Sequence, residues 1–105
     1  MAEMKQYTDE EIISIAKEVF KTEEHALKTT GAAVDGQFVQ AVRTIAACKG
    51  RLVLIGIGKS GHIGRKIAAT LASTGTPSFF VHPTEALHGD LGMITNQDLV
   101  LALSF

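Results

Sequence analysis

The sequence predicts an α/β fold built on a parallel sheet, and two observations carry this prediction. Three short runs of apolar and β-branched residues, 51–57, 78–82 and 98–104, have the character of strands buried on both faces. Between the first two runs, apolar residues recur at helical spacing, which gives the order strand, helix, strand, connection, strand. Right-handed crossovers then place the second and third strands on opposite sides of the first. Ligands of such sheets bind at the carboxyl ends of the strands, beside the point where the strand order reverses.

A long helix is expected ahead of the sheet. Thr8 and Glu11 have the spacing of a capping box, and acidic residues occupy the first turn that follows. Apolar side chains then recur at helical intervals up to about Thr29, and Gly31 is the expected stop.

A second helix is expected after Asp35, its predicted N-cap, with Gly50 as the C′ residue. The pattern changes from helical to strand-like directly after this glycine. We divide the chain into an N-terminal helical lead-in, residues 1–35, and a second part, residues 36–105, which carries the second helix and the strands.

The third helix is expected to follow a turn at residues 58–61 and to end near Gly75 and Pro77. Residues 83–92 follow the second strand. They are polar and contain glycine, which indicates a connection with one helical turn.

The composition excludes several classes of protein. The chain of 105 residues is 46% hydrophobic and 20% charged, which is typical of a soluble globular domain. A net charge of −1 without clustered Lys and Arg argues against a nucleic-acid partner. The longest apolar run, about six residues, is far too short to span a membrane. The single cysteine, Cys48, precludes an internal disulfide, and the polar N-terminus lacks a signal peptide, so a cytoplasmic location is expected.

Residues 56–61, Gly-Ile-Gly-Lys-Ser-Gly, match the G-x-G-x-x-G pattern between a strand and a helix. A dinucleotide site would need an acidic residue near the end of the second strand, where Val81, His82 and Pro83 stand. A Walker A loop would need glycine where Val53 stands. A single phosphate monoester needs neither feature and fits best, bound at the helix N-terminus. The remaining alternative is that the glycines serve only tight packing of the strand against the helix.

Four residues of this loop are candidates for the site. Gly58, Ser60 and Gly61 are expected to bind the phosphate, and Ser60 would serve equally as the N-cap of the third helix. Lys59 is expected to neutralise charge or to polarise an oxygen of the substrate, the alternative being a solvated surface lysine.

The segment His82–Asp90 places two histidines and two carboxylates close to the carboxyl ends of the strands. His88 is a candidate acid–base group or hydrogen-bond donor, the alternative being a loop histidine tied to a backbone carbonyl. Glu85 is a candidate substrate-binding residue. Together with His82 and Asp90, these two side chains also form a candidate site for a divalent metal such as zinc, with His88 as a ligand.

Three stretches of the chain resemble the D-arabinose 5-phosphate isomerase family. They are residues 58–66, Gly-Lys-Ser-Gly-His-Ile-Gly-Arg-Lys, residues 73–83, and residues 88–93, His-Gly-Asp-Leu-Gly-Met; the similarity runs from about Gly50 to Phe105. Enzymes of this family carry a sugar isomerase (SIS) domain, usually followed by a pair of CBS domains. The resemblance implies a five-stranded, flavodoxin-like parallel sheet with flanking helices, a cytoplasmic homotetramer, and a role in supplying the precursor of the Kdo sugar of lipopolysaccharide.

The resemblance also implies roles for individual residues. Lys59 matches the family's active-site lysine, and Ser60 matches the first serine of its phosphate loop. His88 matches an active-site histidine that has also been linked to metal binding. The implied reaction, aldose–ketose isomerisation of D-arabinose 5-phosphate to D-ribulose 5-phosphate, passes through an enediol. It needs a base, an oxygen polariser and a grip on the phosphate, and it requires no cofactor.

The family's pattern continues beyond the position of Phe105 with a Ser-Gly-x-Ser/Thr phosphate loop, further acidic and histidine catalytic residues, and the CBS pair. We therefore expect this chain to be the N-terminal part of a SIS domain, to lack CBS domains, and to be inactive by itself. The alternative is a non-catalytic, sugar-phosphate-binding SIS module of a regulator. Such a module can lose the active-site lysine and histidine, so the presence of Lys59 and His88 favours the enzyme.

Overall fold

The computed structural model of the chain describes residues 6–104. The chain divides into two compact units, Met1–Phe38 and Val39–Phe105. The predicted division at residue 35 stays a prediction. In chain order, the elements are α1 (Asp9–Ala32), α2 (Gly36–Ala47), β1 (Leu52–Ile55), α3 (Gly58–Ser73), β2 (Ser78–Val81), α4 (Pro83–Leu87), the 3-10 helix η1 (Asp90–Met93) and β3 (Leu99–Ala102).

The first unit is dominated by α1, and its predicted capping box is confirmed. The Thr8 hydroxyl accepts from the Glu11 N–H at 3.1 Å, while the Glu11 carboxylate accepts from the Thr8 N–H at 3.2 Å. The predicted stop at Gly31 is wrong: this glycine has no positive φ, and the helix continues to Ala32, with Ala33 as its cap. None of the residues of α1 is buried. Neither α1 nor any other helix within residues 6–104 combines the length and apolarity needed to cross a membrane.

The second unit is a three-stranded parallel sheet in the predicted order β2-β1-β3. Leu52 of the central strand pairs with Ser78 on one side and with Leu99 on the other. Leu52, Val53 and Leu54 are at most 2% exposed, so β1 is buried on both faces as predicted. The strand order reverses between β1 and β3, which gives the expected switch point.

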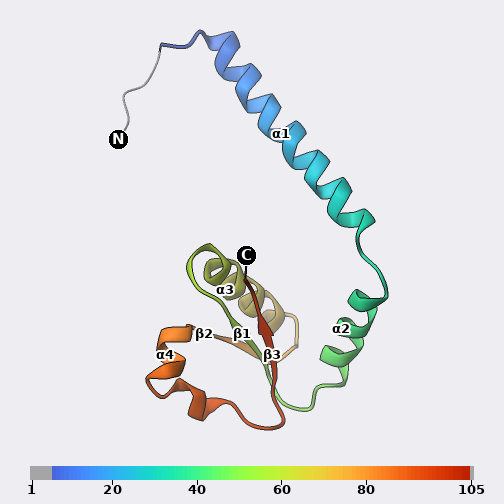
Figure 1. The fold of residues 1–105 in the computed structure, drawn as a ribbon, viewed down its shortest axis with the longest axis vertical. Coiled ribbons are helices and arrows are strands. Elements are labelled where there is room, and N and C mark those ends of the chain that lie inside the picture. The colour runs from blue at the N-terminus through green and yellow to red at the C-terminus, as the bar shows by residue number, and fades with distance from the viewer. Residues whose placement is uncertain (1–5, 105) are drawn as a thin grey trace. The chain divides into compact units, whose positions relative to one another are not determined.

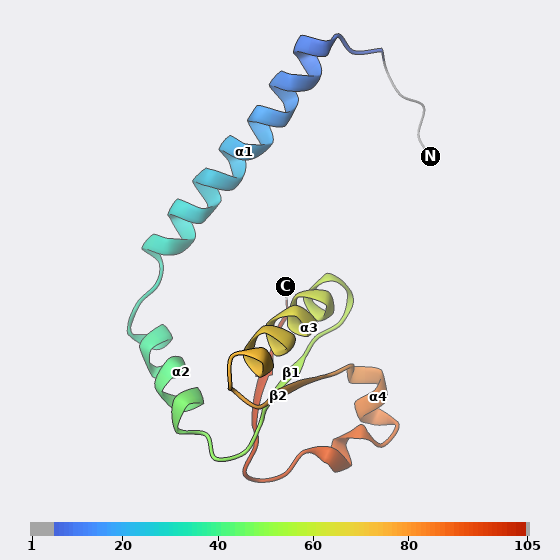
Figure 2. The same cartoon turned by 180° about the vertical axis from the view of Figure 1, so that it is seen from behind.

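Two layers cover the sheet, because alternate side chains of β1 point to opposite faces. Leu52 and Leu54 pack with Ala68 of α3, whereas Val53 packs with Ala86 of α4. Figures 1 and 2 show α3 on one face of the sheet and the α4 connection on the other. The predicted class, a parallel α/β sheet with flanking helices, is confirmed for these three strands.

The predicted N-cap of α2 is confirmed, but the predicted end of that helix is wrong. Asp35 Oδ1 accepts from the Gln37 N–H at 2.9 Å, and α2 begins between them. The helix ends at Ala47, and Gly50 lacks the left-handed φ of a C′ glycine. Instead, a Cβ at Gly50 would collide with the carbonyl of Gln97, to which the Gly50 N–H donates at 3.0 Å. This glycine therefore lets the chain before β1 lie against the chain before β3.

The third strand differs from its prediction in burial. Its residues alternate between half-buried and exposed, and the side chain of Val100 is 49% exposed. Leu99 and Leu101 pack on the α3 side of the sheet. Within the described residues β3 is therefore covered on one face, whereas its apolar sequence predicted burial on both.

Candidate functional site

The glycine-rich loop lies between β1 and α3, at the carboxyl edge of the sheet. The Leu103 N–H donates to the Ile55 carbonyl at 2.8 Å, and a Cβ on Gly56 would meet the Leu103 oxygen at 3.0 Å. A Cβ on Gly61 would lie only 2.7 Å from the Gly56 oxygen. Gly56 and Gly61 therefore serve close packing of backbone on backbone, which is the structural role that the sequence left open.

Gly58 has a different role from its two neighbours in the motif. Its φ is +58°, a left-handed conformation that strongly favours glycine, and a Cβ there would meet nothing within 4 Å. The predicted turn at residues 58–61 is in fact the first turn of α3, because the helix begins at Gly58. The N-cap is Ile57, which makes no side-chain cap, so the predicted cap role of Ser60 is wrong.

The missing side-chain cap leaves donors at the start of α3. The Gly61 N–H donates to the Ile57 carbonyl at 3.2 Å. Within residues 6–104, the N–H groups of Gly58, Lys59 and Ser60 meet no acceptor. These donors sit at the positive end of the dipole of a 16-residue helix. The geometry is therefore suited to an anion the size of a phosphate.

The side chains of Lys59 and Ser60 in this turn are also free of hydrogen bonds and ion pairs with the described residues. Lys59 is exposed and Ser60 is half-buried. Neither side chain makes a hydrogen bond or an ion pair with any described residue. Both groups are therefore available to a ligand, and a lysine ammonium beside the open amides increases the positive charge of the turn.

The histidines of the α4 segment have separate roles. His82 is the N-cap of α4, since its Nδ1 accepts from the Thr84 N–H at 3.1 Å; it is not the last residue of the strand as predicted. His88 is the C-cap, and its backbone N–H donates to the carbonyls of Thr84 and Glu85 at 3.2 and 3.1 Å. The imidazole of His88 and the carboxylate of Glu85 are exposed, and neither makes a hydrogen bond within the described chain. The alternative of an imidazole tied to a backbone carbonyl is therefore wrong.

The candidate metal site does not form. Across residues 6–104, no group of three or more His, Cys, Asp or Glu side chains is arranged to hold a metal ion. The Nδ1 of His82 is already engaged in capping α4. The donors therefore do not fit zinc, and no catalytic step is assigned to a metal.

The candidate residues form two groups on neighbouring strands. The loop after β1 carries Gly58, Lys59, Ser60 and Gly61, and α4 after β2 carries the other two candidates. The last residues of the two parallel strands, Ile55 and Val81, are partners in the register, so both segments leave the sheet at the same edge. No hydrogen bond or ion pair joins the two groups within the described residues.

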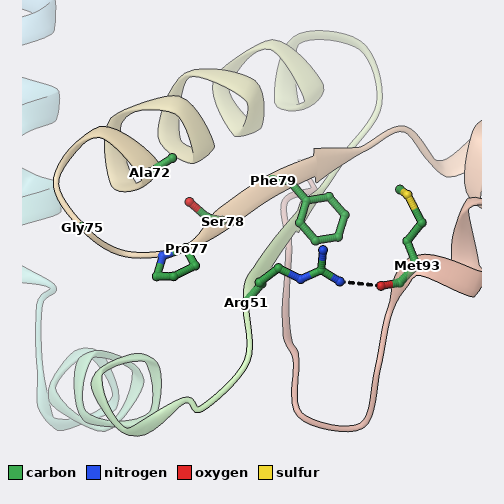
Figure 3. Close-up of a pocket in the computed structure, with 7 residues that line it drawn as sticks. All are labelled: Arg51, Ala72, Gly75, Pro77, Ser78, Phe79 and Met93. Carbon is green, nitrogen blue, oxygen red and sulfur yellow. Dashed lines mark hydrogen bonds between the residues drawn. The ribbon is translucent and has the colours of Figure 1, made fainter.

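The opposite, amino edge of the sheet holds a groove of about 600 Å³, lined by Arg51, Ala72, Gly75, Pro77, Ser78, Phe79 and Met93 (Figure 3). Beside it, the Asp98 carboxylate accepts from the backbone N–H groups of Thr95 and Arg51 at 2.8 and 2.7 Å. The Asp98 side chain is 2% exposed. The Thr95 N–H, followed by the Arg51 N–H, lowers the pKa of Asp98 to about 2.

The sequence did not predict this contact between Arg51 and Asp98 at the amino edge. A local signal was present, because Thr95 and Asp98 have the spacing of a side-chain-to-backbone turn. The partner Arg51, however, is 47 residues away, and no short-range pattern links the two.

The comparisons with known proteins agree with this geometry. The model of the SIS domain family matches residues 45–105. The chain belongs to the SIS domain family. Arabinose 5-phosphate isomerase KdsD of Pseudomonas aeruginosa is 56% identical over 94 residues, which are 90% of this chain and 29% of the relative. GutQ of Escherichia coli, also called an arabinose 5-phosphate isomerase, is 68% identical over 68 residues, 65% of this chain and 21% of the relative.

A solved structure is similar over nearly the whole chain. The Escherichia coli CFT073 protein c3406, in complex with arabinose 5-phosphate, matches with a TM-score of 0.89 and 44% identity. The match covers 93% of this chain and 52% of that one. The SIS chain thus spans less than a third of the curated relatives' length and about half of the solved chain. The resemblance stated from the motifs is confirmed.

Proposed function

We propose that this SIS chain serves the interconversion of D-arabinose 5-phosphate and D-ribulose 5-phosphate. The observation that carries the proposal is the uncapped first turn of α3, where three N–H groups, the Ser60 hydroxyl and the Lys59 ammonium have no partner among the described residues. A phosphate monoester fits this donor set, and relatives of the chain are named for this substrate.

In the proposed reaction, a base removes the proton from C2 of the aldose while O1 gains a proton. The enediol that forms then takes a proton at C1 and loses the one on O2, which gives the ketose. Lys59 and His88 are the proposed donors that stabilise charge on O1 and O2. The open N–H groups of Gly58, Lys59 and Ser60 hold the phosphate, and Gly61, whose own N–H donates to the Ile57 carbonyl, lets the loop pack closely enough to present them. Glu85 is a proposed contact to the sugar hydroxyls.

None of the described residues is assigned as the base of this reaction. Within residues 6–104, no carboxylate is hydrogen-bonded to or ion-paired with Lys59 or His88. We therefore expect the 105-residue chain to bind the sugar phosphate but not to turn it over. The proposal also includes a cytoplasmic homotetramer that supplies the precursor of Kdo in lipopolysaccharide synthesis.

A titration with two ligands tests the proposal. Arabinose 5-phosphate should bind to the chain, whereas arabinose should bind far more weakly because the phosphate supplies the charge. Ser60→Ala should weaken arabinose 5-phosphate binding about tenfold, the loss of one hydrogen bond to a charged group. The matched control is Ser73→Ala at the other end of α3, where the hydroxyl donates to the Thr70 carbonyl. Equal losses for both ligands, or in both variants, would refute the phosphate role of the loop.

A second titration separates the isomerase from a dinucleotide-binding protein. β2 ends at Val81, and the first acidic residue after it, Glu85, lies in α4. The ribose of a dinucleotide therefore lacks its usual carboxylate partner at the strand end. Calorimetric titration with NAD or NADP should show no saturable binding, and a micromolar dissociation constant would overturn the isomerase in favour of the dinucleotide site.

Turnover decides between the enzyme and the regulatory module. If a longer chain of this protein binds arabinose 5-phosphate and forms ribulose 5-phosphate, the proposal of an isomerase is correct. Binding with the same dependence on Ser60 but without turnover in that longer chain favours the non-catalytic sugar-phosphate sensor.

A further inference from the structure

The exposed segment that carries His88 is held at its two ends. At one end, Ala86 is 6% exposed and packs with Val53 and Val81 under the sheet. At the other end, Ile94 packs against the same cluster. Between these anchors, residues 87–93 are mostly exposed, and Leu87 is 83% exposed. The direction of the His88 imidazole therefore depends on how firmly the two ends are fixed.

Arg51 holds the second end directly (Figure 3). Its Nη2 donates to the carbonyl of Met93, the last residue of η1, at 2.6 Å. The same nitrogen donates to Asp98 Oδ2 at 3.4 Å. The guanidinium also lies over the ring of Phe79, 4.6 Å from its centroid. The side chain thus connects the start of β1 with β2 and with the residues on both sides of the turn before β3.

These contacts use properties that only arginine has. The planar guanidinium donates to two acceptors in fixed directions while its face lies on an aromatic ring. A lysine ammonium at the same place can neutralise Asp98 and donate to the Met93 carbonyl, but it has no planar face to lie on the Phe79 ring while it does so. The Asp98 carboxylate itself is fixed by the Thr95 N–H, so the guanidinium is oriented from a rigid base.

We infer that Arg51 is a positioning residue that fixes the segment presenting His88 to the sugar phosphate. This inference rests on the proposed function. It adds that the amino edge of the sheet, opposite the proposed phosphate loop, affects how the sugar of the ligand is bound. It does so by fixing the connection between α4 and β3.

The first experiment needs no ligand. Hydrogen exchange is followed by mass spectrometry in the 105-residue chain and in Arg51→Met and Arg51→Lys. The N–H groups of Gly92 and Ile94, which donate to the carbonyls of Gly89 and Leu91, should exchange about tenfold faster in Arg51→Met. Arg51→Lys should give an intermediate rate, because it keeps the charge.

Arg65→Met is the matched control. The Arg65 guanidinium lies 4.3 Å from the centroid of the Phe80 ring, so it has the same stacking as Arg51. It makes no hydrogen bond with any described residue. Exchange at Gly92 and Ile94 should therefore stay at the wild-type rate. Equal acceleration in the Arg51 and Arg65 variants, or none in either, overturns the inference.

The second experiment is a double-mutant cycle on ligand affinity. Arg51→Met should weaken arabinose 5-phosphate binding about fivefold in the wild-type background and should have no effect in a His88→Ala background. Inorganic phosphate, which engages only the first turn of α3, should bind equally to all four proteins. Additive losses, or a parallel loss of phosphate affinity, would show that Arg51 acts through general stability and overturn the inference.

The two experiments separate the two proposals. If the wild-type chain binds neither arabinose 5-phosphate nor phosphate, the proposed function fails, and the exchange rates still decide whether Arg51 orders the segment. If the wild-type chain binds but the cycle is additive, the proposed function stands and the inference fails. Should Arg51→Met fail to fold, Arg51→Lys carries both measurements.

Discussion

The two edges of this small sheet differ in whether their polar side chains are bonded within the protein. At the amino edge, Asp98 and Arg51 use their side chains on the backbone of the protein itself, and the Asp98 side chain is almost completely buried. At the carboxyl edge, Lys59, Ser60 and His88 have side chains without a partner among the described residues. At the amino edge of the sheet these polar groups are therefore bonded within the protein, whereas at the carboxyl edge these three side chains are free to bind a ligand.

One glycine at each edge, Gly50 and Gly58, shows the same difference. Gly50 at the amino edge is needed because the chain before β3 passes too close for a side chain. Gly58 at the carboxyl edge has free space around it, and its left-handed φ alone explains the residue. Close contact at Gly50 fixes the fold, whereas the open space at Gly58 leaves room for a ligand beside the closely packed Gly56 and Gly61. Substitutions at the two edges should therefore separate effects on stability from effects on binding.

The largest expected effect is at Gly50. A Cβ there would collide with the Gln97 carbonyl and approach Asp98 Oδ1 to 2.6 Å, and these atoms belong to the hydrogen-bonded amino edge. Gly50→Ala should lower the free energy of unfolding by about 3 kcal/mol, as overpacking against the backbone does. Urea denaturation measures the loss.

Gly92→Ala is the control for this substitution. Gly92 has no positive φ, and a Cβ there would meet nothing within 4 Å. The control should change the free energy of unfolding by less than about 0.5 kcal/mol. If the two variants are equally stable, the close packing assigned to the amino edge is wrong.

A smaller effect is expected at Asp98, and it should depend on pH. The pKa of this carboxyl is lowered from 3.8 to about 2, chiefly by the Thr95 N–H and then by the Arg51 N–H. The folded state thus prefers the carboxylate, so the stabilisation is fully present above pH 3.8 and is lost as the pH falls toward 2. Asp98→Asn should flatten the dependence of the urea midpoint on pH in this window.

The matched control for the pH dependence is Asp90→Asn. Asp90 belongs to η1, and its side chain makes no hydrogen bond with the described residues. This variant should keep the wild-type slope between pH 4 and pH 2. A slope that Asp98→Asn leaves unchanged would contradict the role of Asp98 at the amino edge.

Much of the fold could be predicted because its determinants are local. The continuous apolar run around Leu54 predicted a central buried strand, and Thr8 with Glu11 predicted the start of α1. The carboxyl-edge loop was found for the same reason, since its six residues are contiguous. Family resemblance then supplied roles for Lys59 and His88 that spacing alone does not give.

The rest could not be predicted because it depends on contacts distant in sequence. Gly50 looked like a helix cap, and only its approach to Gln97 explains it. Ser60 looked like an N-cap, but the left-handed Gly58 starts the helix earlier. The grip of Arg51 on Met93 spans 42 residues and leaves no local pattern.

The smallest effect on stability is expected at Ser60. A substitution there tests most directly whether the polar side chains of the carboxyl edge are free of contacts within the protein. If Ser60 were the N-cap of α3, Ser60→Ala would cost about 1 kcal/mol of stability. In the structure the cap is Ile57, and the Ser60 hydroxyl makes no hydrogen bond with the described residues. Ser60→Ala should therefore change the free energy of unfolding by less than about 0.5 kcal/mol in urea denaturation. A loss near 1 kcal/mol without ligand would mean that the carboxyl edge also uses its polar side chains on itself, and the proposed phosphate loop would lose its main support.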